Sequence, residues 1–353
     1  MPILQVDNQS SYEIHMEPGI LGRCGEEIRP LLPAAVRALI ITDSNVAPLY
    51  GETVRASLER AGFATALHVF PAGEEHKNLD TVAAMLEACC DAGLSRSDCI
   101  VALGGGVCGD LAGFAAAIYL RGIAFVQIPT TLLAQIDSSV GGKTGCDLPA
   151  GKNLAGAFHN PRRVLIDPAV LDSLPDHYFK DGMGEAVKYG CLFSPALFRR
   201  IADENPRDFL GQLIQDCVAF KRDVVQRDFT ESGERMFLNF GHTLGHAIER
   251  YHHYTGVSHG EAVGMGMVAV TKASEAAGLT KPGTAAAIAA CLQKLGMPVD
   301  AGLSARQLGE LAALDKKRRG NQINLVLIKD IGQPFIHTLP LDGLCAFLEG
   351  GSL

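Results

Sequence analysis

Residues 99–117, CIVALGGGVCGDLAGFAAA, decide the fold class of this chain. The segment opens with apolar residues, turns through three glycines, and continues as a small-residue stretch that predicts a helix starting near Asp110. A strand, a glycine turn and a helix in this order are typical of parallel α/β sheets. Backbone amides in the turn could approach a pyrophosphate, and the dipole of the helix would favour an anion there. A tight packing turn is the alternative interpretation.

The same alternation extends through the first half of the chain. Because strand and helix follow in turn, we expect a parallel sheet with helices on both faces and ligands at the carboxyl ends of its strands. Asp43 and Asn45 follow the first expected strand. The expected strands are 36–42, 63–70, 99–103, 125–128 and 163–167, and helical patterns cover 49–61 and 79–92.

The second half has a different pattern, in which helical segments dominate. We therefore expect a Rossmann-like α/β domain over residues 1–177 and an all-α domain over 178–353, with the site between them. The turn at 172–176 marks the boundary. Helical patterns cover 185–193, 213–228, 243–251 and 261–277, and only 323–328 and 335–338 look extended.

Composition limits the function classes. With 353 residues, 47% of them apolar, and a net charge of −8, the chain predicts a globular protein that does not bind nucleic acid. Its apolar stretches are too short for a membrane span and predict buried helices. The N-terminus lacks the features of a signal peptide, so we expect a cytoplasmic protein. The ten cysteines show no C-x-x-C spacing and predict buried free thiols, Cys146 being the one to watch.

Residues 141–153, GGKTGCDLPAGKN, place Lys143 and Lys152 on glycine-rich backbone that predicts neither a regular helix nor a regular strand. Asp137 and two serines precede them. Fixed lysines of this kind indicate a site for a phosphorylated small molecule, and a solvated basic loop is the alternative.

The glycine turn also satisfies G-x-G-x-x-G through Gly104, Gly106 and Gly109, which alone is weak evidence for a dinucleotide. A Rossmann fingerprint needs an acidic residue about 20 positions downstream, where this chain has none. Asp43, upstream, could serve, so we expect an unusual dinucleotide fold. The turn with Glu74 and Lys77 is either a second functional loop or the start of a helix.

Histidines in the second half indicate a metal site. His242, His246 and Glu249 share one helical face, and His259 follows 17 residues after His242. Imidazoles with a carboxylate such as Glu185 are the usual ligands of zinc-like ions. Spacing alone favours His242 with His246, whereas core or capping histidines are the alternative. The run of cations at 316–319 indicates a solvated face.

Taken together, these segments resemble the 3-dehydroquinate synthase family of sugar-phosphate cyclases. The resemblance covers nearly the whole chain, through GEEHK, GGGVCGD, RGIAFVQIPTTLLAQIDSSVGGKTG, PAGKNLAGAFH, GEAVKYG, ERMFLNFGHTLGHAIE, HGEAV and DKK. It implies an NAD-binding α/β domain, a helical metal-binding domain and a homodimer. The implied enzyme converts 3-deoxy-D-arabino-heptulosonate 7-phosphate to 3-dehydroquinate and phosphate. The implied steps are transient oxidation by NAD, β-elimination of phosphate, re-reduction, ring opening and aldol closure.

The resemblance also implies roles for individual residues. Glu185, His242 and His259 become the ligands of a zinc or cobalt ion, and His246 moves to the substrate, against the interpretation from spacing. Arg121 would reach the neighbouring subunit's site. The NAD set is Asp43, Asn45, Glu74, Lys77, Gly105, Gly106, Val107, Cys108, Gly109, Asp110, Thr130, Thr131, Lys143, Lys152, Val170, Leu171, Asp172 and Ser173. The substrate set is Arg121, Asp137, Lys143, Lys152, Asn153, Lys188, Lys221, Arg235, Asn239, His246 and either Lys316 or Lys317.

One departure from the family pattern lies in the lysine stretch, where Cys146 and Asp147 replace a valine or isoleucine followed by asparagine. The extra carboxylate could alter substrate contacts. The alternative functions are another sugar-phosphate cyclase, a glycerol-dehydrogenase-like oxidoreductase, and a binding protein without activity. The residues that the family's chemistry needs are all present, which disfavours the last.

Overall fold

The chain folds into two compact units, seen in a computed structural model that describes residues 2–8, 10–231, 233–253, 255–316 and 321–350. Unit 1 comprises Met1–Pro175 and Lys221–Gln226, and unit 2 comprises Asp176–Phe220 and Arg227–Leu353. The sequence predicted one cut after residue 177. The structure instead ends the first stretch of unit 1 at Pro175 and adds to this unit a part of helix α7 (Leu210–Arg227).

Unit 1 is built on a seven-stranded sheet in the order β1-β2-β9-β6-β5-β3-β4. Its neighbouring strands pair in parallel except at one edge, where β1 is antiparallel to β2. The predicted parallel sheet is confirmed, and β3, β4, β5, β6 and β9 lie at the five expected segments. The strands are β1 (Ile3–Val6), β2 (Tyr12–Met16), β3 (Arg37–Asp43), β4 (Ala64–Phe70), β5 (Cys99–Gly104), β6 (Ala124–Pro129) and β9 (Arg163–Ile166).

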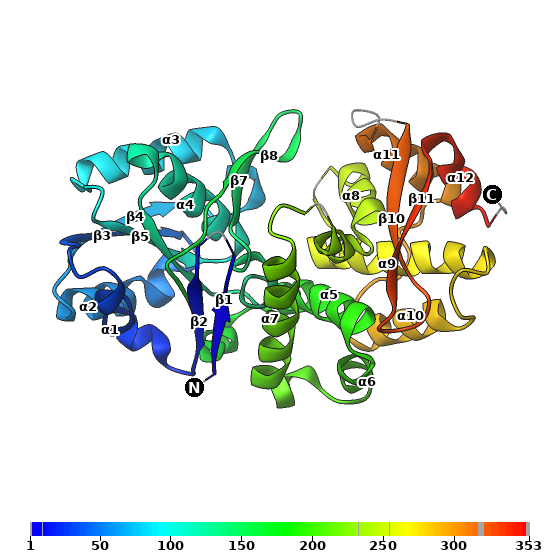
Figure 1. Cartoon of the computed structure of the whole chain (residues 1–353), viewed down its shortest axis with the longest axis horizontal. Coiled ribbons are helices and arrows are strands. Elements are labelled where there is room, and N and C mark those ends of the chain that lie inside the picture. Colours follow the sequence, from blue (N-terminus) through cyan, green and yellow to red (C-terminus); the bar gives the residue numbers. More distant parts are fainter. Residues whose placement is uncertain (1, 9, 232, 254, 317–320, 351–353) are drawn as a thin grey trace. The chain divides into compact units, whose positions relative to one another are not determined.

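Helices cover both faces of this sheet because its central strands are apolar on both sides. Leu39 and Ile41 of β3 belong to a core with α3 and α4, whereas Ala38 and Ile40 belong to a second core with α1 and α2. Figure 1 shows the two helix pairs on opposite faces. The helices are α1 (Cys24–Ile28), α2 (Glu52–Arg60), α3 (Leu79–Asp91) and α4 (Gly106–Ile118).

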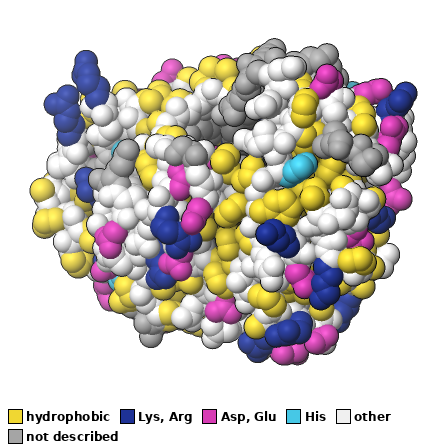
Figure 2. All heavy atoms as spheres, turned by 45° about the vertical axis from the view of Figure 1, so that its right-hand side comes forward, with side chains coloured by type: hydrophobic (Ala, Val, Ile, Leu, Met, Phe, Trp, Pro, Cys, Tyr) yellow, Lys and Arg dark blue, Asp and Glu magenta, His cyan; other side chains and the backbone are white. Residues whose placement is uncertain are grey.

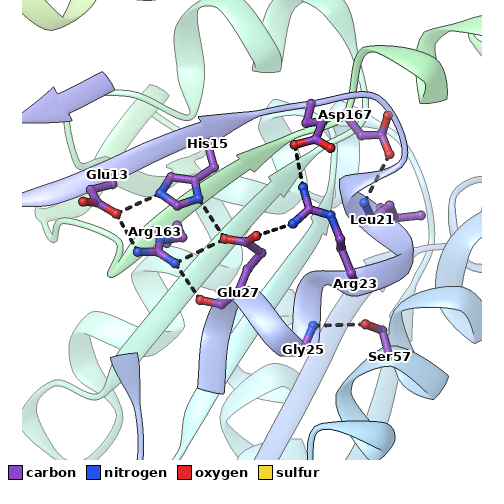
Figure 3. A network of polar contacts seen from close by, with 10 residues as sticks. Glu13, His15, Leu21, Arg23, Gly25, Glu27, Ser57, Arg163 and Asp167 are labelled. Atoms are coloured by element: carbon purple, nitrogen blue, oxygen red, sulfur yellow. Dashed lines mark hydrogen bonds and ion pairs between the residues drawn. The ribbon is translucent and has the colours of Figure 1, made fainter. Parts of the chain in front are cut away.

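A network of ion pairs ties β2 to β9 (Figure 3). His15 lies between the carboxylates of Glu13 and Glu27, at 2.8 Å from each. Arg163 contacts the same carboxylates, at 2.6 Å and 3.4 Å. The hydrogen bond from His15 and the charge of Arg163 lower the pKa of Glu13. The edge strands, which the sequence did not predict, are thus held by charges that lie partly buried.

The lysine stretch forms an antiparallel hairpin of β7 (Lys143–Leu148) and β8 (Gly151–Phe158). The expectation of irregular backbone was therefore wrong. Gly145 and Gly156 face each other across the hairpin, and a Cβ on Gly145 would lie 2.6 Å from the carbonyl oxygen of Ala155. These glycines allow close strand pairing, whereas the sequence analysis placed Gly145 in an irregular stretch.

Unit 2 is helical except for the antiparallel hairpin of β10 (Gln322–Ile328) and β11 (Pro334–Pro340). The predicted helical second domain is confirmed, and its two strands lie at the segments that had looked extended. The helices are α5 (Asp176–Phe193), α6 (Pro195–Asp203), most of α7, α8 (His242–Tyr251), α9 (His259–Ala276), α10 (Thr284–Lys294), α11 (Ala305–Lys316) and α12 (Leu344–Leu348).

The surface and the cysteines agree with the globular composition. On the face in Figure 2, Lys and Arg side chains are interspersed with Asp and Glu side chains. The cysteines are free thiols, of which Cys90 is exposed, Cys345 is half-buried and the others, Cys146 included, are buried. Among the described residues, no helix combines the length and the apolar character needed to cross a membrane.

Candidate active site

A three-donor group lies where three helices of unit 2 meet. Glu185 comes from the middle of α5, and His242 and His259 are the first residues of α8 and α9. The Oε1 atom of Glu185 lies 3.4 Å from Nε2 of His242 and 3.3 Å from Nε2 of His259. The donor atoms of the three residues all lie within 4.8 Å of one another. Two imidazoles and a carboxylate are the ligands of a catalytic zinc site, so these residues fit a divalent metal.

Glycines let these helices approach closely enough to bring the three donors together. A Cβ on Gly184 of α5 would lie 2.4 Å from the carbonyl oxygen of Gly260. A Cβ on Gly266 of α9 would lie 2.1 Å from the carbonyl oxygen of Gly241, next to His242. Side chains at these positions would separate the backbones that carry the three donors.

Replacing Gly260 by alanine is therefore expected to disrupt the three-donor group. Its new Cβ would lie 1.9 Å from the carbonyl oxygen of Asp181 on α5, so the start of α9 must move and carry His259 with it. We expect a loss of stability of about 3 kcal/mol, at the upper end for overpacking, together with weaker Co²⁺ binding. Thermal unfolding and Co²⁺ titration measure both effects.

The matched control is Gly211→Ala, at an exposed position of helix α7 where a Cβ meets no atom within 4 Å. This variant should bind Co²⁺ as the wild type does and should be as stable or slightly more stable. A Gly260→Ala protein with unchanged Co²⁺ binding would show that the close approach of α5 and α9 does not matter for the site.

The electrostatics of the group favour a cation. Burial alone would raise the pKa of Glu185, but Lys188 and the two imidazoles hold it well below its usual range. Burial, together with Lys188, lowers the pKa of His242, which keeps this imidazole neutral. Burial would also lower the pKa of His259, but hydrogen bonds with Glu185 and Glu249 raise it to about 10. The buried carboxylate of Glu185 thus faces the neutral imidazole of His242 and the imidazole of His259, which a bound metal could deprotonate.

His246, which spacing had paired with His242, lies in a different group. Its side chain is exposed and joins Glu249 and His259 in a second set of potential ligands. Its ring centroid lies 5.6 Å from that of His242 and 6.2 Å from that of His259. His246 is therefore close to the three-donor group but outside it.

Two cations of unit 2 that belong to the expected substrate set are fully buried. Lys188 forms an ion pair with Glu185, and both side chains are 1% exposed. Arg235, also 1% exposed, donates from its backbone to Asp228 at 3.0 Å and from its guanidinium to the carbonyl of Phe229. Asn239 ends the 3-10 helix Glu234–Asn239, which also contains Arg235, and its side chain donates to Glu231 at 2.6 Å. Of the pair expected near substrate, Lys316 is the last residue of α11 and Lys317 lies outside the described residues.

The glycine turn of unit 1 forms a cradle at the start of α4. Gly105 precedes the helix, and a Cβ there would lie 3.0 Å from the methyl group of Thr131. A Cβ on Gly104 would lie 2.6 Å from Cβ of Cys108 and 3.3 Å from the carboxylate of Asp43. The first turn of α4 presents backbone N–H groups beside this carboxylate, which fits the pyrophosphate and ribose of a dinucleotide.

Charged residues gather around the turn of unit 1 that contains Glu74 and Lys77. Lys77 is 6% exposed, and its Nζ lies 2.7 Å from Asp110. Lys152 on β8 lies 3.3 Å from Glu74, which is in the same turn as Lys77. Although burial would lower the pKa of Lys77, Asp110 and Glu74 raise it.

Asp147 belongs to this cluster and shapes the tip of the β7–β8 hairpin. Its carboxylate accepts a 2.7 Å hydrogen bond from the backbone N–H of Asn153, a non-glycine residue at φ 53°. Its own N–H donates to the carbonyl of Lys77 at 2.7 Å. Burial raises the pKa of Asp147, while Asn153 and the nearby lysines act against this. The carboxylate that departs from the family pattern thus holds the backbone beside Lys152.

The remaining expected residues of unit 1 lie on several loops. Asp137 forms an ion pair with Lys221. Tyr50, which the sequence analysis missed, donates to the carbonyl of Val170 at 3.0 Å, and its hydroxyl lies 2.6 Å from Oγ of Ser173. The other positions are Asn45 after β3; Gly106, Val107, Cys108 and Gly109 in the first turn of α4; Thr130 after β6; exposed Lys143 on β7; Leu171 and Asp172 in the 3-10 helix Pro168–Ser173; and exposed Arg121 after α4.

Comparisons with known proteins show what the chain is similar to. Residues 67–181 match the 3-dehydroquinate synthase N-terminal family model, and residues 182–318 match the 3-dehydroquinate synthase C-terminal model. A 3-dehydroquinate synthase from Clostridium acetobutylicum is 45% identical over 333 residues, which are 93% of each chain.

Two solved structures are similar along almost their whole length. One is 2-deoxy-scyllo-inosose synthase complexed with carbaglucose-6-phosphate, NAD⁺ and Co²⁺, with a TM-score of 0.85, 25% identity and coverage of 99% of this chain and 100% of the other. The other is 2-epi-5-epi-valiolone synthase from Streptomyces hygroscopicus with NAD⁺ and Zn²⁺ bound, with a TM-score of 0.85, 26% identity and 98% coverage of both chains.

Proposed function

The chain belongs to the 3-dehydroquinate synthase family, and we propose that it converts 3-deoxy-D-arabino-heptulosonate 7-phosphate to 3-dehydroquinate and phosphate. It is a phosphate-eliminating lyase of the shikimate pathway that uses NAD and a zinc or cobalt ion. One observation carries the proposal: buried Glu185 faces His242 and His259 in a chain 45% identical to a named synthase.

The residues that would hold the two cofactors belong to separate groups of side chains. Glu185, His242 and His259 would hold the metal, and the loops around Asp43 and Lys77 would hold NAD. When bound, NAD supplies a reversible hydride acceptor, and the metal supplies Lewis acidity toward substrate oxygens.

The chain's own cations would bind and orient a substrate that has two anionic groups. The substrate carries a carboxylate and a phosphate, each of which needs fixed donors in a site shielded from water. Arg235 and Lys188 are buried and hydrogen-bonded or ion-paired in place, so they can serve without reorganising. The exposed imidazole of His246 could hold or pass a proton beside the three-donor group. Lys143, Lys152, Asn153, Asn239, Lys221 and Asp137 complete the proposed substrate contacts.

The nearest alternative is a cyclase that acts on another sugar phosphate. Similarity favours dehydroquinate synthesis, because identity is 45% to the synthase from Clostridium acetobutylicum but 25–26% to the two other cyclases. A glycerol-dehydrogenase-like oxidoreductase would instead accumulate NADH.

The test is an assay of phosphate release from the heptulosonate phosphate. Purified protein with NAD and Co²⁺ should release phosphate, and removal of the metal with a chelator should stop the release until metal is restored. Glucose 6-phosphate serves as the comparison substrate. Release from glucose 6-phosphate but not from the heptulosonate phosphate would replace the proposed substrate with that of another cyclase.

We also propose that the enzyme acts as a homodimer in the cytoplasm. Leu120 and Arg121 adopt left-handed backbone conformations, at φ 50° and φ 70°, which are strained for residues with a side chain. This turn leaves Arg121 exposed. Exposure is what we expect of a residue that contributes to the neighbouring subunit's site. Sedimentation of the purified protein tests the dimer.

A further inference from the structure

His259 is held between two carboxylates, one on each side of its ring. Nε2 faces Glu185 at 3.3 Å, and Nδ1 faces Oε1 of Glu249 at 3.4 Å. Glu249 is 3% exposed, and it comes from α8, whereas His259 begins α9. Because Glu249 is buried, its carboxylate does not serve to keep the protein surface hydrated. It faces the ring nitrogen of His259 that points away from Glu185, which indicates a role at this histidine.

The packing of α8 against α9 places Glu249 beside His259. Gly245, one turn before Glu249, lies so close to α9 that its Cβ would be 3.1 Å from the backbone of Val263. Residues 245 and 249 lie on one face of α8, and residues 259 and 263 lie on one face of α9. Because Gly245 packs against Val263, Glu249 lies beside the start of α9. The same close approach that brings His242 to the three-donor group thus brings Glu249 to His259.

Two roles are open to Glu249, because it also forms a potential ligand group with His246 and His259. One imidazole cannot serve both groups as a neutral ligand, because each ring has one lone pair in its neutral form. The group with Glu185 uses Nε2 of His259. Nδ1 must then carry the proton, and a proton on Nδ1 points at Glu249.

We propose that Glu249 is a positioning residue, which accepts a hydrogen bond from Nδ1–H of His259 and thereby fixes the ring with Nε2 free to bind the metal. This inference rests on the metal site of the proposed function. Ligating histidines generally donate their second N–H to a carboxylate or carbonyl, and loss of that partner typically weakens metal binding by about 10–100-fold.

Co²⁺ titration of the apo-protein, followed by visible absorption, tests the role of Glu249. We expect Glu249→Leu to raise the Kd for Co²⁺ by about 10–100-fold. Glu261→Gln is the matched control, because Glu261 lies two residues after His259 and accepts a hydrogen bond from Ser258 at 3.0 Å, away from the imidazole. The control should keep the wild-type Kd. An unchanged Kd in Glu249→Leu overturns the inference, and loss of binding as complete as in His259→Ala makes Glu249 a ligand and overturns it too.

A second measurement needs no variant. In the Zn²⁺-loaded wild type, long-range ¹⁵N–¹H correlation spectra should show His259 protonated at Nδ1 and metal-bound at Nε2. Metal on Nδ1 contradicts the proposed role even if the metal site itself is correct. If the wild type binds neither Co²⁺ nor Zn²⁺, the metal assignment of the proposed function fails instead.

Discussion

Replacing His259 by alanine is expected to abolish metal binding and turnover together. The substitution leaves Glu185 and His242, and two protein ligands do not make a catalytic zinc-type site. Phosphate release should fall by at least about 10³-fold, because metal catalysis of this kind contributes several kcal/mol to the barrier. Metal content by atomic emission and phosphate release, measured on the same preparation, check both parts.

His177→Ala provides the matched control for this prediction. His177 is an exposed histidine in the first turn of α5, the helix that carries Glu185, and its ring centroid lies 4.0 Å from that of Tyr178, with the ring planes tilted by 42°. The control should retain both metal and activity. Full metal occupancy in His259→Ala would show that the ligand set of Glu185, His242 and His259 is wrong.

Replacing Lys77 by methionine is expected to destabilise unit 1 and to weaken NAD binding. The substitution leaves the largely buried carboxylate of Asp110 without its 2.7 Å partner, in a cluster that also contains Glu74 and Asp147. Removing one partner of a buried pair costs about 3–5 kcal/mol. For a unit of this size, that corresponds to a fall in Tm of roughly 6–20 °C. Calorimetry and NAD titration measure the two effects.

The double variant Lys77→Met/Asp110→Leu should recover part of the lost stability, because it removes the unpaired charge as well. Arg55→Met serves as the control, since Arg55 pairs with Glu52 at 2.7 Å on the solvent-exposed face of α2, and loss of such an exposed pair should leave the stability almost unchanged. Equal Tm values for Lys77→Met and Arg55→Met would contradict the account of a buried ion pair.

The inner strands of unit 1 could be predicted because a strand that is buried on both faces appears in the sequence as a run of apolar residues. Segments 36–42 and 99–103 are rich in apolar residues, and they form β3 and β5, each of which has a neighbouring strand on both sides. β1 and β2 lie at the edge, where polar residues such as Glu13 and His15 are held by ion pairs. Their strand character depends on partners from distant parts of the chain, so it was not visible locally.

Glycines led to a wrong prediction of local structure in unit 1, and their role in helix packing in unit 2 was not predicted. Gly145 was taken as part of an irregular stretch, but in the β7–β8 hairpin it pairs closely with Gly156. In unit 2, Gly184 and Gly260 permit the contact between α5 and α9 that brings Glu185 near His259. Helical spacing paired His242 with His246, because periodicity reports neighbours on one helix and not contacts between helices. The three-donor group depends on such contacts, so only the family resemblance anticipated it.

The most direct test of the central claim is to follow NADH absorbance and phosphate release in one reaction with the heptulosonate phosphate. A cyclase that returns its hydride releases phosphate over many turnovers while NADH stays below one equivalent per active site. NADH that rises in step with the product, or that forms steadily from a polyol without phosphate release, would show that the chain is an oxidoreductase and would contradict the proposed function.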